Sequence, residues 1–181
     1  MQDEKSLVRR AQQHDQTALT QIYEENFDKI YRYIVLKIGD RTEAEDMTQQ
    51  VFLSAFKSIS SFQYKKGTPF SSWLYRIAHN QIVDYLRKKS KRATVPLNES
   101  LASSTSGNSN PPLAVERNLD VERLVSATKR LTKAQREVIS LRFAGELPVA
   151  QVAKVMGKSE GAIKALQHSA IVSLRKLLAA G

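Results

Sequence analysis

The stretch that decides the fold is Pro148 to Leu177, PVAQVAKVMGKSEGAIKALQHSAIVSLRKL. Its apolar residues recur every three or four positions, which predicts two helices. Pro148 suits the first turn of the first helix, and Gly157 follows its last apolar residue, where a left-handed residue is favoured. Ser159 is placed to cap the second helix, with Glu160 near its positive end. This layout is typical of a helix-turn-helix, whose second helix enters the DNA major groove, although an ordinary pair of antiparallel helices is the alternative.

The composition narrows the class of protein. The chain has 181 residues, of which 41% are hydrophobic, and it has no cysteine, which excludes disulfides and thiolate metal sites. It has no run of about 18 apolar residues and no signal peptide, so we expect a soluble, cytoplasmic protein without direct membrane insertion. The net charge of +10 comes from basic residues on both sides of a nearly uncharged middle. This distribution favours a polyanionic partner over a merely basic soluble protein.

Helical periodicity also governs the rest of the chain. It predicts helices over residues 6–13, 17–37, 43–58, 69–89 and 119–131, and another that follows Thr132 and closes at Gly145. Thr42 with Glu45, and Thr132 with Gln135, have the spacing of capping boxes. Residues 93–117 are rich in Ser, Asn, Gly and Pro, which predicts a flexible linker spanning roughly 25–30 Å. The sequence therefore predicts an all-α protein of two small helical domains, residues 1–92 and 118–181.

Two segments of the first domain carry residue types that bind nucleic acid. Residues 60–69 bring the aromatic Phe62 and Tyr64 next to Lys65 and Lys66, which supplies the stacking surfaces for bases and the charges for phosphates that single-stranded nucleic acid binding requires. The helix over 69–89 then places polar residues at intervals of four on one face, and Asn and Arg make bidentate contacts with base edges. We expect Asp84 to orient a neighbouring Arg or Asn, and Trp73 to belong to the core. The candidate residues are Phe62, Tyr64, Lys65, Lys66, Arg76, Asn80, Asp84, Arg87 and Lys88.

An enzyme is the least favoured function. His14, His79 and His168 are scattered, and neither metal-ligand spacing nor a nucleophile motif accompanies them. We therefore predict no catalytic residues, no metal site and no cofactor.

Four motifs in order resemble one family. They are AEDMTQQVFLSAF (44–56), FSSWLYRIAHNQIVDYLRKKSKR (70–92), LTKAQREVISLRF (131–143) and the helix-turn-helix. Together they resemble the bacterial RNA polymerase sigma factors of the extracytoplasmic function (ECF) group, the small members of the sigma-70 family. The resemblance covers nearly the whole chain apart from the linker. It implies a subunit that binds core RNA polymerase, recognises the minus-10 and minus-35 promoter elements and aids promoter melting.

The resemblance also implies partners and residue roles. The partners are the clamp helices of the largest polymerase subunit, the flap of the second-largest subunit, promoter DNA and an anti-sigma factor. The residues implied in polymerase binding are Asp46, Gln49, Gln50 and Phe52. The loop 62–70 resembles the element that captures a flipped base, and the face with Arg76 and Asn80 resembles the minus-10 reader. The residues implied at the minus-35 element are Arg142, Lys158, Ser159, Lys164, Gln167, His168, Arg175 and Lys176.

The chain departs from the family pattern at two places. Gln50 stands where the family often has Glu, which removes one charged contact with the polymerase. Leu166, Ser169 and Ile171 occupy positions that are often basic, so we expect minus-35 binding either to be weaker or to lean on phosphate contacts and DNA shape. A stand-alone helix-turn-helix regulator remains the alternative function, because such a protein needs only the C-terminal domain.

Overall fold

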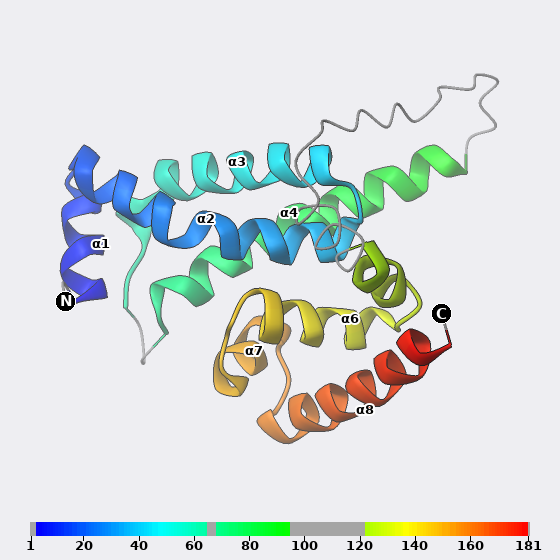
Figure 1. The fold of residues 1–181 in the computed structure, drawn as a ribbon. Coiled ribbons are helices and arrows are strands. Elements are labelled where there is room, and N and C mark those ends of the chain that lie inside the picture. The colour runs from blue at the N-terminus through cyan, green and yellow to red at the C-terminus, as the bar shows by residue number, and fades with distance from the viewer. Residues whose placement is uncertain (1–2, 65–67, 95–121, 181) are drawn as a thin grey trace, which may run out of the picture.

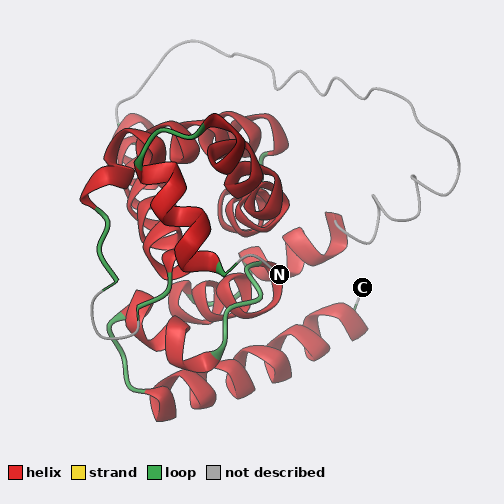
Figure 2. Ribbon diagram, turned by 90° about the vertical axis from the view of Figure 1, so that its left-hand side faces the viewer, coloured by secondary structure: helices red, strands yellow, loops and turns green. Residues whose placement is uncertain are grey.

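The computed structural model describes residues 3–64, 68–94 and 122–180, and every regular element among them is helical (Figure 2). What we call the first domain contains α1 (Glu4–Gln12), α2 (Gln16–Ile38), α3 (Arg41–Ser58), the 3-10 turn η1 (Ile59–Ser61) and α4 (Phe70–Ala93). The second domain contains a helix over residues 122–129, α6 (Lys133–Ile139), the π-helical turn η2 (Ser140–Ala144), α7 (Val149–Met156) and α8 (Glu160–Ala179). The all-α prediction is confirmed.

Helix α2 is the centre of the molecule. In Figure 1, α3 lies along one side of α2, and the second domain lies along the other. Ile22, Ile30 and Ile34 of α2 are almost completely buried, because apolar residues spaced by three and four turn one stripe of the helix inward. Val51 of α3 and Leu74 of α4 are buried in the same core cluster. The long first-domain helices are thus positioned by one apolar core.

The second domain packs directly on the first. Tyr75 of α4 donates a hydrogen bond from its hydroxyl to the carbonyl oxygen of Gly145, at 3.1 Å. The hydroxyls of Ser71 and Ser72 donate to the side-chain oxygen of Gln151 on α7, each at 3.3 Å. The apolar core is continuous across this contact, since buried residues of both domains belong to one cluster. The two domains therefore form one closed body.

The helix ends of the second domain confirm the local predictions. Thr132 and Gln135 form both hydrogen bonds of a capping box at the start of α6. Gly157 adopts the left-handed conformation, with a φ of 63°, and the hydroxyl of Ser159 accepts a hydrogen bond from the backbone N–H of Ala162. The predicted helix to Gly145 is regular only to Ile139 and continues as the π-helical turn η2.

The predicted cap of α3 is wrong. Thr42 and Glu45 do not open this helix; instead Asp40 caps it, with its carboxylate accepting from the backbone N–H of Glu43 at 2.9 Å, and the helix begins at Arg41. Asp is a strong N-cap residue because its oxygen satisfies an N–H that has no partner inside the helix. Two potential caps stand close together in the sequence, and the structure uses the first.

Replacing Asp40 with alanine is expected to lower the free energy of unfolding by about 1 kcal/mol, because the first turn of α3 loses its cap. Thr42→Ala is the matched control, since Thr42 is exposed and does not cap the helix. It is expected to change stability by less than about 0.5 kcal/mol. Urea unfolding of both variants measures the difference, and equal effects would argue against Asp40 as the cap.

The predicted linker over 93–117 falls mostly outside the described residues. Ala93 is still the last residue of α4, so this helix continues four residues beyond the predicted end. Residues 95–121 are outside the described part of the chain, as is the beginning of the helix predicted over 119–131. The described part of that helix covers residues 122–129.

Candidate functional site

Helix α3 presents one polar face outward. Asp46, Gln49 and Gln50 are all exposed, as expected for residues that contact a partner. Phe52, which was expected beside them, is instead 2% exposed and packs against Tyr23 of α2 with ring centroids 4.9 Å apart. Burying this large side chain attaches α3 to α2. Phe52 therefore fixes α3 to the core behind the exposed face and is not available to contact a partner.

The exposed face of α3 contains one apolar residue that the sequence analysis missed. Leu53 is 52% exposed, and it follows Asp46 by seven positions and Gln50 by three, which places all three on one side of the helix. The helical spacing could have identified it, but only if Phe52 had been assigned to the core. An exposed leucine beside polar side chains is a suitable apolar anchor for a protein partner.

An aromatic cluster lies at the start of α4. Phe62 is 5% exposed and packs edge-on against Phe70, with ring centroids 5.4 Å apart. Tyr64 is half-buried, and its hydroxyl donates a hydrogen bond to Glu4 at 3.2 Å. Burial and the carboxylate of Glu4 both raise the pKa of Tyr64, which keeps its hydroxyl neutral. Lys65 and Lys66, predicted beside these aromatics, lie outside the described residues.

An open cavity of about 370 Å³ lies against this cluster. Trp73, predicted as a core residue, is only half-buried and lines the cavity together with Phe62 and the exposed Arg76. Because Phe62 is mostly covered by its neighbours, Trp73 is the larger accessible aromatic surface. The remaining lining residues are Ser61, Gln63, Thr68 and Ser72. The cavity thus combines an aromatic wall, polar groups and one cation, which suits a planar base with its phosphate.

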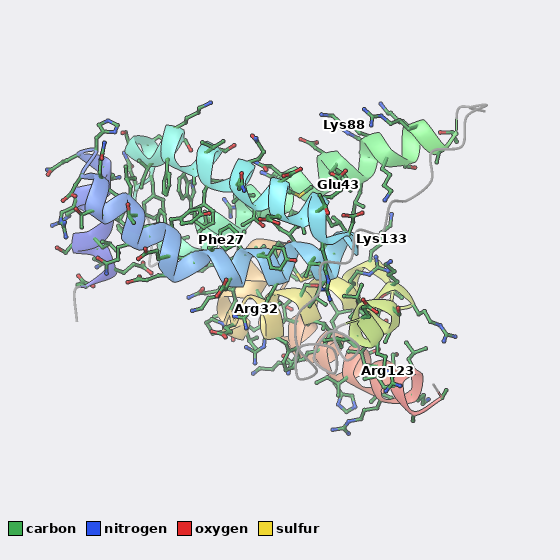
Figure 3. All side chains as sticks on the ribbon, turned by 45° about the horizontal axis from the view of Figure 1, so that its top comes forward. Phe27, Arg32, Glu43, Lys88, Arg123 and Lys133 are labelled. Atoms are coloured by element: carbon green, nitrogen blue, oxygen red, sulfur yellow. The ribbon has the colours of Figure 1, made fainter. Side chains whose placement is uncertain are left out.

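The outer face of α4 is polar and basic. Arg76, Asn80 and Asp84 are exposed along one side of the helix, followed by Arg87 and Lys88. Asp84 accepts a hydrogen bond from the guanidinium of Arg87 at 3.0 Å, which confirms that this acid orients a neighbouring arginine. Figure 3 shows Lys88 on the far part of α4, beyond Glu43 of α3. This face can contact both phosphates and base edges.

The helix-turn-helix of α7 and α8 presents a second polar surface. The exposed candidates on it are Lys158, Ser159, Lys164, His168, Arg175 and Lys176. Arg142 and Gln167 are half-buried and bonded to each other, with Nε of Arg142 donating to the amide oxygen of Gln167 at 2.8 Å. Arg142 also donates to the carbonyl oxygen of Leu147 at 2.6 Å. Arg142 therefore braces the turn that precedes α7, in addition to its expected role at phosphates.

Two further observations concern the described residues as a whole. Residues 3–64, 68–94 and 122–180 include no helix with the length and hydropathy needed to cross a membrane. Within the same ranges, no group of three or more His, Asp or Glu side chains is arranged to hold a metal ion.

Both domains match descriptions of known families. The family Sigma-70 region 2 matches residues 22–92, and the family Sigma-70, region 4 matches residues 127–176. These segments contain the α3 face, the aromatic cavity, the α4 face and the helix-turn-helix.

Individual proteins resemble the chain over most of its length. The ECF RNA polymerase sigma factor BldN of Streptomyces coelicolor is 39% identical over 172 residues, which cover 95% of this chain and 64% of BldN. The ECF RNA polymerase sigma factor SigW of Bacillus subtilis is 29% identical over 181 residues, covering 96% of each chain. This chain therefore spans less than two thirds of BldN but nearly all of SigW.

Solved structures resemble the fold. CnrH, determined in complex with the cytosolic domain of CnrY, superposes with a TM-score of 0.72 at 22% identity, covering 96% of both chains. The sigma factor RpoE, determined with the anti-sigma factor NepR from Bartonella quintana, gives a TM-score of 0.68 at 22% identity, covering 88% of this chain and 95% of that one.

Proposed function

The chain belongs to the sigma-70 family, within the ECF group of RNA polymerase sigma factors, and on this premise we propose that it binds core RNA polymerase and directs transcription initiation at specific promoters. The observation that carries the proposal is the surface of the first domain. A stand-alone helix-turn-helix regulator has no use for the exposed α3 face or for the aromatic cavity beside the basic face of α4. A sigma factor uses both, together with the helix-turn-helix.

The first domain supplies two of the proposed contacts. Asp46, Gln49, Gln50 and Leu53 on α3 bind the polymerase, and Phe52 holds that helix in place. The α4 face, with Arg76 and Asn80, reads the minus-10 element. The aromatic cavity accepts a base that has left the duplex, since stacking offsets the cost of extracting it. The chemistry of transcription belongs to the polymerase, and this subunit is not an enzyme.

The helix-turn-helix supplies the third contact, at the minus-35 element. Lys164 and His168 lie on the exposed side of the N-terminal half of α8, the part of a recognition helix that meets base edges. Lys158, Arg175 and Lys176 are placed to pair with phosphates. The remaining charge of α8 is small, so phosphate contacts and DNA shape contribute a large share of the binding.

Replacing both Lys164 and His168 with alanine is expected to reduce discrimination between an intact and a substituted minus-35 element by about 5- to 150-fold, because a mismatch at a base pair that a protein reads costs about 1–3 kcal/mol in total. Initiation from the two promoters, measured with polymerase present, gives the ratio. Lys133→Ala is the control, since Lys133 is an equally exposed lysine at the start of α6. Unchanged discrimination in the double variant would exclude these two residues from sequence recognition.

An anti-sigma factor is the proposed regulator, and we place the action of the protein in the cytoplasm. RpoE was determined with the anti-sigma factor NepR and CnrH with the cytosolic domain of CnrY. An apolar groove of about 430 Å³ in this chain offers a docking surface for such a partner. The groove runs between α2 and the second domain, where Phe143 and Leu178 are 54% and 48% exposed. Figure 3 shows Arg32 on the side of α2 that faces the second domain, and Arg32 and Arg175 line the groove. These cations favour an amphipathic helix with acidic residues beside its apolar stripe.

Gel filtration with purified bacterial core polymerase tests the central binding step. The protein is expected to elute with the polymerase as a complex of one copy each. Separate elution, at concentrations where a known ECF sigma factor co-elutes, would contradict the proposal.

A further inference from the structure

Glu137 is a buried acid whose bonded partners come from the other domain. It lies on α6 of the second domain and is 5% exposed. The hydroxyl of Tyr33 donates to its Oε1 at 2.6 Å, and Nδ1 of His79 lies 3.1 Å from the same oxygen. The ammonium of Lys37 pairs with Oε2. Tyr33 and Lys37 belong to α2 and His79 to α4, so the first domain surrounds this carboxylate on both oxygens.

The pKa of Glu137 depends on these partners from the first domain. Burial alone would raise its pKa, but the hydrogen bond from His79 and the charge of Lys37 outweigh burial and lower the pKa to about 2. An ionised carboxylate only accepts hydrogen bonds, which means that Nδ1 of His79 carries the shared hydrogen. Lys37 is itself only 10% exposed. Neither charge could remain buried without the other, since an unpaired buried ion costs several kcal/mol.

The interface between the two domains is closely packed around Glu137. A Cβ added at Gly145 would lie 2.9 Å from the ring of Tyr75, so only glycine allows the backbone directly after η2 to approach α4 this closely. A second set of ion pairs, from Glu146 to Lys29 at 3.4 Å and to Arg32 at 3.5 Å, lies at the rim with side chains about half exposed. Exposed pairs of this kind contribute little to stability. Glu137 is thus the buried charge at the centre of the interface, whereas Glu146 lies at its rim in contact with solvent.

A buried ion pair can favour one placement of the two domains over others and still add little to the stability of that placement. The attraction between Glu137 and Lys37 mostly offsets the cost of taking them out of water. When the domains separate, water solvates both groups again, so this ion pair itself adds little to the cost of opening the interface. Removing only one partner is different, because the closed state then buries an uncompensated charge while the open state does not.

The closed body is too small to engage both promoter elements. The minus-10 and minus-35 elements are centred about 25 base pairs apart, which is roughly 85 Å of duplex at about 3.4 Å per pair. A compact chain of this length has a radius of gyration of about 16 Å and is therefore roughly 40 Å across. Promoter binding by both domains consequently requires that the second domain leave α2 and α4.

We propose that Glu137, held by Tyr33, Lys37 and His79, is the latch of a self-inhibited closed state, and that the latch opens when the protein joins the polymerase and promoter. The claim that the closed state inhibits initiation rests on the proposed sigma function. The claim that Glu137 holds the domains closed does not. The latch sets the population of the open form and thereby the protein concentration needed for initiation.

Energy transfer between two dyes on the full-length free protein measures the latch directly. The chain has no cysteine, so Glu24→Cys and Ala179→Cys on exposed positions give one label in each domain. Glu137→Gln keeps the shape but removes the charge. It is expected to shift the closed-to-open ratio by on the order of 100-fold and to lower transfer efficiency. Lys37→Met, in the other domain, is expected to act in the same direction. Glu146→Gln is the matched control and is expected to change the ratio less than threefold.

Run-off transcription with the same variants, without dyes, tests the inhibition. Glu137→Gln is expected to lower the protein concentration for half-maximal initiation by about tenfold, since less of the protein is closed. Circular dichroism confirms that each variant retains its helices.

The outcomes separate the latch from the function. Unchanged transfer in both Glu137→Gln and Lys37→Met would overturn the latch, and so would an equal fall in Glu146→Gln. Lower transfer with an unchanged or higher half-maximal concentration would overturn the self-inhibition. If neither the wild type nor any variant initiates transcription, the proposed sigma function fails and the self-inhibition with it, while energy transfer still decides whether the latch exists.

Discussion

Replacing Phe52 with alanine is expected to lower the free energy of unfolding by about 3–5 kcal/mol, which is the usual cost of removing a large buried aromatic side chain. Phe52 is 2% exposed and contacts Tyr23, Phe27 and Phe56, with ring centroids between 4.9 and 6.3 Å apart. These contacts join α3 to α2, and the cavity left by alanine would not be filled by rigid helices. Urea denaturation followed by circular dichroism measures the loss.

Leu53→Ala is the control for this variant, because Leu53 follows Phe52 in the sequence but faces solvent, whereas Phe52 faces the core. Leu53 is 52% exposed, so its truncation is expected to change stability by less than about 0.5 kcal/mol. If Leu53→Ala destabilised the protein as much as Phe52→Ala, or if Phe52→Ala were harmless, the placement of these two side chains would be contradicted.

Changing Asp46, Gln49 and Leu53 together to alanine is expected to weaken binding to core polymerase by about 100-fold or more, because these side chains form the centre of the proposed contact. All three are exposed, so the variant is expected to remain folded. Anisotropy of a dye-labelled protein titrated with core polymerase measures the affinity.

A second variant controls for the loss of polar surface. Glu24→Ala with Asp28→Ala changes two exposed acids on α2 and is expected to alter the affinity less than threefold. Equal weakening by the two variants would mean that general charge, and not the α3 face, governs the association.

Local signals in the sequence predicted the helix ends well. Gly157, Ser159 and the Thr132–Gln135 capping box each act within a few residues, so their geometry follows from the sequence nearby. Where two local signals competed, prediction failed: Thr42 and Asp40 both suit an N-cap, and only the structure selects Asp40.

Features that depend on distant parts of the chain could not be predicted in the same way. Phe52 and Leu53 are adjacent, and the apolar spacing of α3 does not by itself decide which of them faces α2. Trp73 packs on one side against the aromatic cluster and lines a cavity on the other. Helical periodicity alone predicts such a residue to be part of the core. Glu137 is separated from Tyr33 by 104 residues and from His79 by 58, so nothing near it in the sequence indicates a buried ion network.

Run-off transcription with purified bacterial core polymerase and a pool of promoter fragments is the most direct measurement of the proposed function. Initiation is expected at a small set of promoters when the protein is added, none of it is expected without the protein, and most of it is expected to disappear with the Asp46, Gln49 and Leu53 triple variant. If no promoter is used and the protein does not join core polymerase, while it still binds duplex DNA through α8, the chain acts as a stand-alone helix-turn-helix regulator and the proposed function is contradicted.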